Sequence, residues 1–109
     1  MSGEIKDILQ EYKAAILQLN NEHIKKMILF GSYARGDFSD DSDIDIMILT
    51  DLENENITAI EKQICDATYD FNYEMQTDIM PIIQNEEHFN FWKNSYMFYK
   101  NVATEGIVV

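Results

Sequence analysis

Residues 27–49 constrain the fold of this chain more than any other segment. Two short apolar runs, residues 27–30 and 44–49, enclose a polar segment that begins with Gly31 and Ser32. Short apolar runs bounded by glycine and polar residues are typical of buried strands. We therefore expect the polar segment to be held between two strands of one sheet.

An aspartate pair, Asp43 and Asp45, stands where the second apolar run begins. Strand side chains alternate between faces, so the two carboxylates share a face and lie about 6.6 Å apart along the strand. Two such carboxylates repel each other unless a cation lies between them, and they can bridge a pair of divalent ions. The pair therefore predicts a metal site.

The Gly31-Ser32 turn supplies a complementary function. Glycine lets the backbone turn with an exposed N–H group, and the neighbouring serine hydroxyl can donate to a phosphate oxygen. Mg²⁺ takes oxygen ligands and usually shares them with substrate phosphates. The two halves together predict a site for a nucleoside triphosphate with its metal, and phosphoryl or nucleotidyl transfer as the chemistry.

Solvated surface, a calcium-binding loop and a P-loop are the alternatives to a metal–nucleotide site in this segment. An isolated Asp-x-Asp in an acidic protein is commonly solvated surface, but its combination with Gly-Ser is rare by chance. Residues 41–52 also imitate the start of an EF-hand, yet Ile46 replaces the required glycine and Leu52 replaces the bidentate glutamate. No P-loop motif occurs in the sequence. We therefore exclude calcium binding and P-loop chemistry.

Asp78 is the candidate third carboxylate. It lies in the otherwise uncharged, strand-like run of residues 75–83, where an aspartate is costly unless a charge meets it. A third acid would complete the shell of a catalytic ion and accept a proton from the attacking group. The alternative is that Asp78 merely begins the strand and faces water.

This pattern resembles the minimal nucleotidyltransferase (MNT) family of the DNA polymerase beta-like nucleotidyltransferase superfamily. The closing residues 99–106 also look like the asparagine and Glu-Gly ending of these small proteins. The family motif G-S-x-A-R-G-x(5)-S-D-x-D reads here as Gly31, Ser32, Ala34, Arg35, Gly36, Ser42, Asp43 and Asp45, with Asp78 as the third acid.

The resemblance implies transfer of a nucleoside monophosphate from a triphosphate to a hydroxyl, with release of pyrophosphate, and AMP from ATP is the first hypothesis. Two Mg²⁺ ions are implied as cofactors, with Mn²⁺ as the alternative metal. The first two acids would hold both ions and the third would hold the catalytic one. The implied site residues are the catalytic and metal-binding Asp43, Asp45 and Asp78 and the nucleotide-binding Gly31, Ser32 and Arg35.

The resemblance also implies a partner. In this family the acceptor is often a tyrosine of a cognate HEPN-domain toxin, so an MntA-like antitoxin that AMPylates its toxin is the first hypothesis. The alternatives are a nucleotidyltransferase acting on a small-molecule hydroxyl and an antitoxin that acts by binding alone. We expect one domain over residues 1–109, which leaves no second domain to bind the acceptor. Nucleotide preference and self-association stay open.

The charge of the chain limits its partners. The formal net charge is −12, and Lys62 is the only lysine or arginine between Gly36 and Trp92. Nucleic-acid binding needs many basic contacts, so we expect no nucleic-acid substrate. Arg35, an isolated cation, either neutralises phosphate or holds its own turn. No signal peptide or long apolar run is present, so we expect a cytoplasmic protein without membrane contact.

Hydrophobic periodicity predicts the first helices and the third strand. Apolar residues recur at helical spacing over residues 5–19 and 57–71, with a polar loop over residues 51–56. Residues 75–83 form the third expected strand, and Pro81 places it at a sheet edge or ends it.

Two further helices are expected over residues 86–93 and 95–103, with Gly106 as a stop. The resulting order predicts an α/β (α+β) fold with a small mixed β-sheet packed with helices. This agrees with the polymerase beta-like fold that the resemblance implies. Large apolar residues crowd residues 89–99 and belong either to the core or to a partner interface, and Cys65 is expected to be a core thiol.

Overall fold

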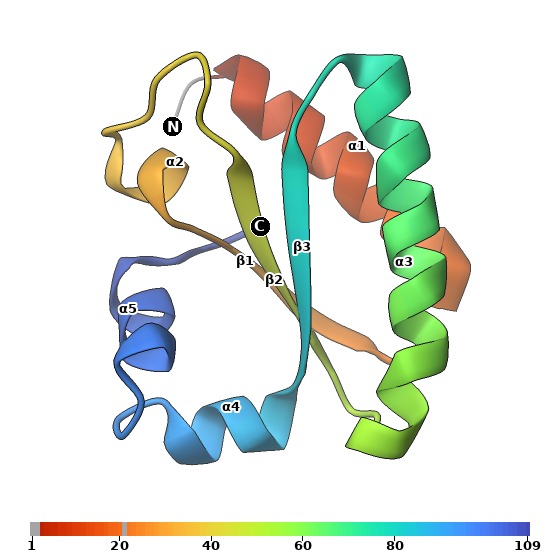
Figure 1. Ribbon diagram of the computed structural model, residues 1–109, viewed down its shortest axis with the longest axis vertical. Helices are drawn as coiled ribbons and strands as arrows, with labels where there is room; N and C mark the ends of the chain where they lie inside the picture. The colour runs from red at the N-terminus through yellow and green to blue at the C-terminus, as the bar shows by residue number, and fades with distance from the viewer. Residues whose placement is uncertain (1–2, 21) are drawn as a thin grey trace.

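The computed structural model describes residues 3–20 and 22–109. An amphipathic helix precedes the first strand, and a single helical turn follows that strand (Figure 1). The elements are α1 (Gly3–Asn20), β1 (Ile24–Phe30), α2 (Ser32–Arg35), β2 (Ile44–Thr50), α3 (Asn54–Met75), β3 (Ile79–Asn85), α4 (Glu86–Trp92), α5 (Met97–Glu105) and β4 (Ile107–Val108).

The strands of the described residues form one four-stranded mixed sheet in the order β3-β2-β1-β4. β2 runs antiparallel to β1, with Phe30 opposite Asp45, and parallel to β3, with Ile44 opposite Ile79. β3 is an edge strand, as Pro81 indicated, because proline has no N–H group to give to a further strand. The expected small mixed sheet is confirmed.

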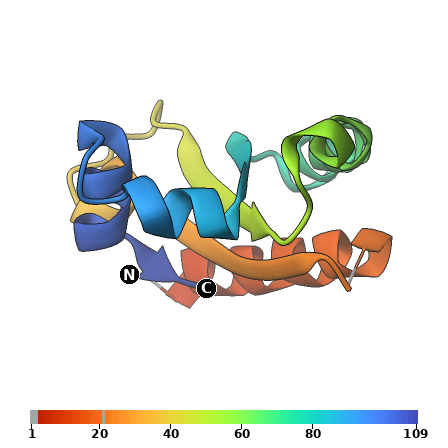
Figure 2. The same cartoon turned by 90° about the horizontal axis from the view of Figure 1, so that it is seen from below.

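The two sheet faces carry different helices. α1 and α3 cover one face through a core that includes Leu29, Ile46 and Ile64. On the other face Met47 and Val102 belong to a smaller core, to which α4 and α5 contribute. In both views α3 and α5 lie on opposite sides of the central strands (Figures 1 and 2). Alternation along β2 places Asp45 on the α5 face, because Met47 and Leu49 lie there.

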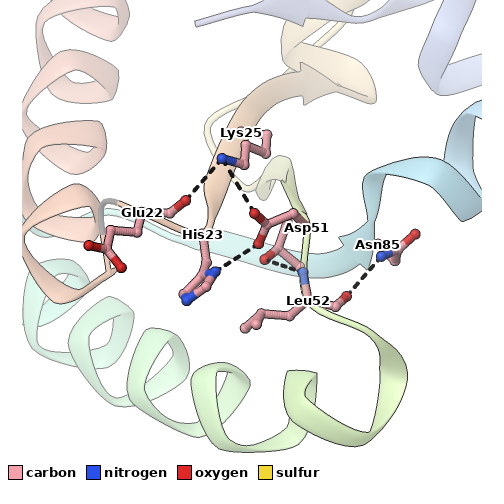
Figure 3. Close-up of polar contacts among 7 residues, drawn as sticks. Glu22, His23, Lys25, Asp51, Leu52 and Asn85 are labelled. Carbon is pink, nitrogen blue, oxygen red and sulfur yellow. Dashed lines mark hydrogen bonds and ion pairs between the residues drawn. The ribbon is translucent and has the colours of Figure 1, made fainter.

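A polar network fixes the register at the far end of β2. His23 Nδ1 lies 2.8 Å from Asp51 Oδ1, and Lys25 Nζ lies 3.4 Å from Asp51 Oδ2 (Figure 3). Asn85 Nδ2 donates to the Leu52 carbonyl at 2.9 Å, which ties the end of β3 to the end of β2. A one-residue slip would break these contacts and move Asp45 to the opposite face.

Two sequence-based boundaries and one burial prediction were wrong. Met75 is the last residue of α3 rather than the start of a strand, and Gln76 ends the helix in the left-handed region with φ 54°. α3 begins at Asn54, inside the expected loop. Cys65 is exposed, because the buried stripe of α3 follows Ile64 and Thr68 and leaves the cysteine outside it.

The C-terminal aromatic segment is partly buried in the core and partly exposed. Phe89 is buried, whereas Phe91, Tyr96 and Phe98 are exposed. α4 ends at Trp92 and α5 ends at Glu105, just before Gly106. In the described part of the chain, no helix is long and apolar enough to cross a membrane.

A buried tyrosine links α1 to α3 and supports a first prediction. Tyr12 Oη lies 2.7 Å from Thr68 Oγ1, and that hydroxyl donates to the Ile64 carbonyl at 2.7 Å. Burial raises the pKa of Tyr12 to about 12. The unfolded chain therefore loses this proton first, and stability should fall as pH rises from about 10 to about 12.

We predict that Tyr12→Phe lowers the unfolding free energy by about 1 kcal/mol at neutral pH, because one buried hydrogen bond is lost. The variant should also show a smaller loss of stability between about pH 10 and pH 12. Urea unfolding across this range is the measurement. An unchanged alkaline slope in the variant would show that Tyr12 does not cause it.

Candidate functional site

Gly31 connects β1 to α2 in a conformation that favours glycine. Its φ is 74° and its ψ is −153°. The Gly31 carbonyl accepts from the N–H groups of Ala34 and Arg35, both at 3.1 Å, which closes the single turn of α2. A Cβ atom on Gly31 would overlap the Asp45 carboxylate. The glycine backbone and this carboxylate are therefore in close contact across the β1–β2 pair.

Asp45 is half-buried at this contact. Burial raises its pKa above the ordinary range, the charge of Asp43 raises it further, and Arg35 partly opposes both effects. The carboxylate is thus held in a place that disfavours its own negative charge. A cation between the two acids would relieve this cost, and their oxygen donors fit Mg²⁺.

Asp43 and Asp78 lie one residue before the first paired residues of β2 and β3. The Ile44 N–H donates to the Asp78 carbonyl at 2.9 Å, which joins the two strand starts. Both acids are exposed. Within residues 3–20 and 22–109, no three histidine, cysteine, aspartate or glutamate residues are grouped so that they could hold one metal ion. The structure thus brings the acids to one end of the sheet without gathering them into a cluster.

Asn72 positions the turn that carries Asp78. Its Oδ1 accepts from Thr77 Oγ1 and from the Ile79 N–H, both at 2.9 Å. Its Nδ2 donates to the Ile79 carbonyl at 3.0 Å. One side chain therefore holds the residues on both sides of Asp78. Asn72 was missed in the sequence, because an asparagine in a long helix gives no signal of contacts beyond it.

A cavity of about 350 Å³ opens beside the Gly31–Asp45 contact. α2 and α5 lie on the same side of the strands (Figure 1), and both contribute to its wall. The ending of residues 99–106 was matched to the family in the sequence, but its place in the wall of a cavity was not predicted. The lining residues are Phe30, Gly31, Ser32, Arg35, Asp45, Phe98, Asn101, Val102 and Glu105.

Arg35 is held by acids at this cavity. Its Nε lies 3.2 Å from Asp37 Oδ2, and its Nη1 lies 3.3 Å from Glu105 Oε2. Hydrogen bonding to Asp37, followed by hydrogen bonding to Glu105, raises the pKa of the guanidinium. The side chain holds its own turn against α5 and also lines the cavity, so both expected roles stay compatible with its position.

Ser42 organises the loop that leads to the acids. Its Oγ accepts from the Ser39 N–H at 2.9 Å, and its own N–H donates to the Ser39 carbonyl at 3.1 Å. Upstream, the rings of Tyr33 and Phe38 stack with centroids 4.3 Å apart. These contacts order the path between α2 and Asp43.

A family model for the nucleotidyltransferase domain matches residues 9–102. The chain belongs to this family. It is therefore a nucleotidyltransferase, and the family that the sequence motif predicted is confirmed.

Relatives from Methanocaldococcus jannaschii carry the provisional name of protein adenylyltransferase. One is 36% identical over 101 residues, which are 93% of this chain and 93% of that protein. Another is 43% identical over 60 residues, which are 55% of this chain and 58% of that protein. The first alignment spans nearly the full length of both chains.

Solved structures share the fold. A mutant of the toxin–antitoxin pair MntA–HpeT aligns with a TM-score of 0.55 and 18% identity, covering 90% of this chain and 69% of that one. A toxin–antitoxin structure with AMP-PNP aligns with a TM-score of 0.51 and 20% identity, again covering 90% and 69%. At these identities the likeness establishes the fold of the nucleotidyltransferase, as the sequence predicted.

The Gly31–Asp45 contact leads to a second prediction. Gly31→Ala should lower the unfolding free energy by about 3 kcal/mol, because a strained backbone adds to an overlap with a carboxylate. Gly36→Ala is the matched control, since Gly36 has φ 84° but open space around its Cβ position. Its cost should be about 1 kcal/mol. Equal losses in chemical denaturation would contradict the contact.

Proposed function

We propose that this nucleotidyltransferase, as one domain of residues 1–109, moves AMP from ATP onto a tyrosine hydroxyl of a cognate HEPN-domain toxin and so acts as its antitoxin in the cytoplasm. The observation that carries the proposal is the cavity in which Gly31, Ser32 and Asp45 meet. A phosphate-binding turn and a carboxylate that needs a cation share this wall. The name of the relatives supports AMP transfer to a protein. The solved toxin–antitoxin structures, one of them with AMP-PNP, support a toxin as the partner and ATP as the nucleotide.

The roles follow from the positions of the residues. The Gly31 backbone and the Ser32 hydroxyl bind triphosphate oxygens, while Asp43 and Asp45 provide carboxylates for Mg²⁺. When bound, Mg²⁺ neutralises phosphate charge and supports both the attacking and the leaving oxygen. Arg35 contributes a further positive charge at the cavity wall.

The transfer step forms a bond between the tyrosine oxygen and the α-phosphorus of ATP. The bond from that phosphorus to the bridging oxygen of the β-phosphate breaks, and pyrophosphate leaves. The proton of the tyrosine hydroxyl passes to the Asp78 carboxylate, which acts as general base. Asn72 keeps this base in place through the Thr77 and Ile79 contacts described above.

ATP binding gives a third prediction. At a free concentration of Mg²⁺-ATP one hundred times Kd, the protein should gain about 2.7 kcal/mol of stability. The Asp43→Asn, Asp45→Asn double variant should not show this gain. In the absence of ligand it should be at least as stable as the wild type, because a repulsive pair of charges is removed. Thermal unfolding with and without Mg²⁺-ATP is the measurement.

The matched control is Asp40→Asn with Asp41→Asn, which removes the same charge from two exposed acids of the same loop. This control should keep the ligand-induced gain. If the gain persists in the Asp43 and Asp45 variant, those residues do not hold the metal.

Transfer gives a fourth prediction. With α-labelled ATP, Mg²⁺ and the cognate HEPN-domain protein, the wild type should place label on a partner tyrosine. Asp78→Asn should bind ATP normally and slow transfer at least about 100-fold, because a general base is lost. Full activity of this variant would remove Asp78 from the mechanism. Neutralisation of the toxin by Asp43→Asn without transfer would favour action by binding alone.

A further inference from the structure

Asp78 lines a second cavity. It has a volume of about 420 Å³ and is lined by Asp78, by Asn72 and by two tyrosines of α3, Tyr69 and Tyr73. It shares no lining residue with the cavity that contains Asp45. The proposed general base and the proposed metal ligand therefore face separate cavities.

A neighbouring cavity shares the two tyrosines. It has a volume of about 610 Å³ and is lined by these tyrosines together with Asp70 and Glu74. Tyr69 and Tyr73 are four residues apart in the helix, as are Asp70 and Glu74, so the four side chains share one outer face. We call the two cavities, which share Tyr69 and Tyr73, the tyrosine groove.

The exposure of the two tyrosines is unusual. Tyr69 is 73% exposed and Tyr73 is 75% exposed, although large aromatic side chains usually bury much of their surface. Neither packs into the core that α3 shares with α1. Exposed aromatic rings with hydroxyl groups are typical of surfaces that bind other proteins.

The negative charge of the groove favours a basic binding partner. Asp70, Glu74 and Asp78 contribute three carboxylates, and no lysine or arginine is among its lining residues. Lysine and arginine side chains pair with carboxylates and also bind over the faces of tyrosine rings. A basic segment can therefore pair with the carboxylates of the groove and also bind over its tyrosine rings.

We propose that the tyrosine groove binds a lysine- or arginine-rich segment of the partner protein and leads its acceptor tyrosine to Asp78. The nucleotide and the acceptor then approach the acids from different cavities and do not compete for space. Binding in the groove is independent of catalysis, whereas delivery of the hydroxyl to Asp78 rests on the proposed function.

Binding is tested with two fluorescent peptides, each with one central tyrosine flanked by either lysines or glutamates. Fluorescence anisotropy should show that the lysine peptide binds the wild type, that salt weakens binding, and that the glutamate peptide binds far less. Asp70→Asn with Glu74→Gln should weaken the lysine peptide about tenfold, because two exposed charge pairs are together worth roughly that factor.

Glu55→Gln with Glu87→Gln is the matched control. These exposed acids line a cavity that shares no residue with the groove, and their removal changes the net charge equally. The control should bind the lysine peptide within about twofold of the wild type. Equal weakening in both double variants, or equal binding of both peptides, would contradict the proposal that the tyrosine groove binds a basic segment.

A ring test separates docking from self-modification. Tyr73→Phe keeps the aromatic face and should keep peptide binding, whereas Tyr73→Ala should weaken it several-fold. Mass spectrometry after incubation with ATP and Mg²⁺ should find AMP on the lysine peptide rather than on Tyr73. AMP on Tyr73 with no dependence of peptide binding on its ring would contradict the proposal.

The same samples distinguish the two proposals. If the lysine peptide binds through Asp70 and Glu74 but receives no AMP, the groove stands and the proposed transfer to protein tyrosine fails. If the peptide receives AMP equally from the wild type and from the Asp70→Asn, Glu74→Gln variant, the transferase stands and the groove fails.

Discussion

The close contact between the Gly31 backbone and the Asp45 carboxylate is the constraint on which the rest of the site depends. It exists because β1 and β2 pair with Phe30 opposite Asp45, and because residue 31 has no side chain. The polar network of His23, Lys25 and Asp51 fixes that register at the far end of the strands. The Gly31-Ser32 turn and the Asp45 carboxylate, which we propose bind phosphate and metal, are thereby held together by the same backbone hydrogen bonds that form the sheet.

The electrostatics of the site follow from this placement. Asp45 is half-buried beside Asp43, so folding brings together groups that disfavour each other until a cation binds. Functional sites commonly hold such unfavourable charge, and the packing of the remaining fold offsets its free-energy cost. Here the α1–α3 core covers the opposite face of the sheet and leaves the acids on the face that α5 borders. The cavity that Asp45 lines and the tyrosine groove share no lining residue.

The sequence was sufficient for the parts of the fold that short-range patterns determine. Apolar runs around Gly31 and Asp45 predicted β1 and β2, helical periodicity predicted α1 and α3, and Pro81 predicted an edge strand. It failed where tertiary contacts decide. Met75 continues a helix that Gln76 ends, and no local pattern reports the Asn72 contacts that follow. The two-residue β4 pairs with the edge of β1, and the α5 wall of the cavity beside Asp45 depends on packing between distant segments.

The central claim is that Gly31 and Asp45 bind the metal and the nucleotide, with Asp78 beside them at the same end of the sheet. Paramagnetic broadening in ¹⁵N-labelled protein tests it most directly, with Mn²⁺ added together with a non-hydrolysable ATP analogue. The account predicts that the amide signals of Gly31, Asp45 and Asp78 broaden first, while those of Asp51 and Asn85 at the far ends of the strands stay sharp. Broadening that begins at the far ends, or that spreads evenly over the acidic surface, would contradict it.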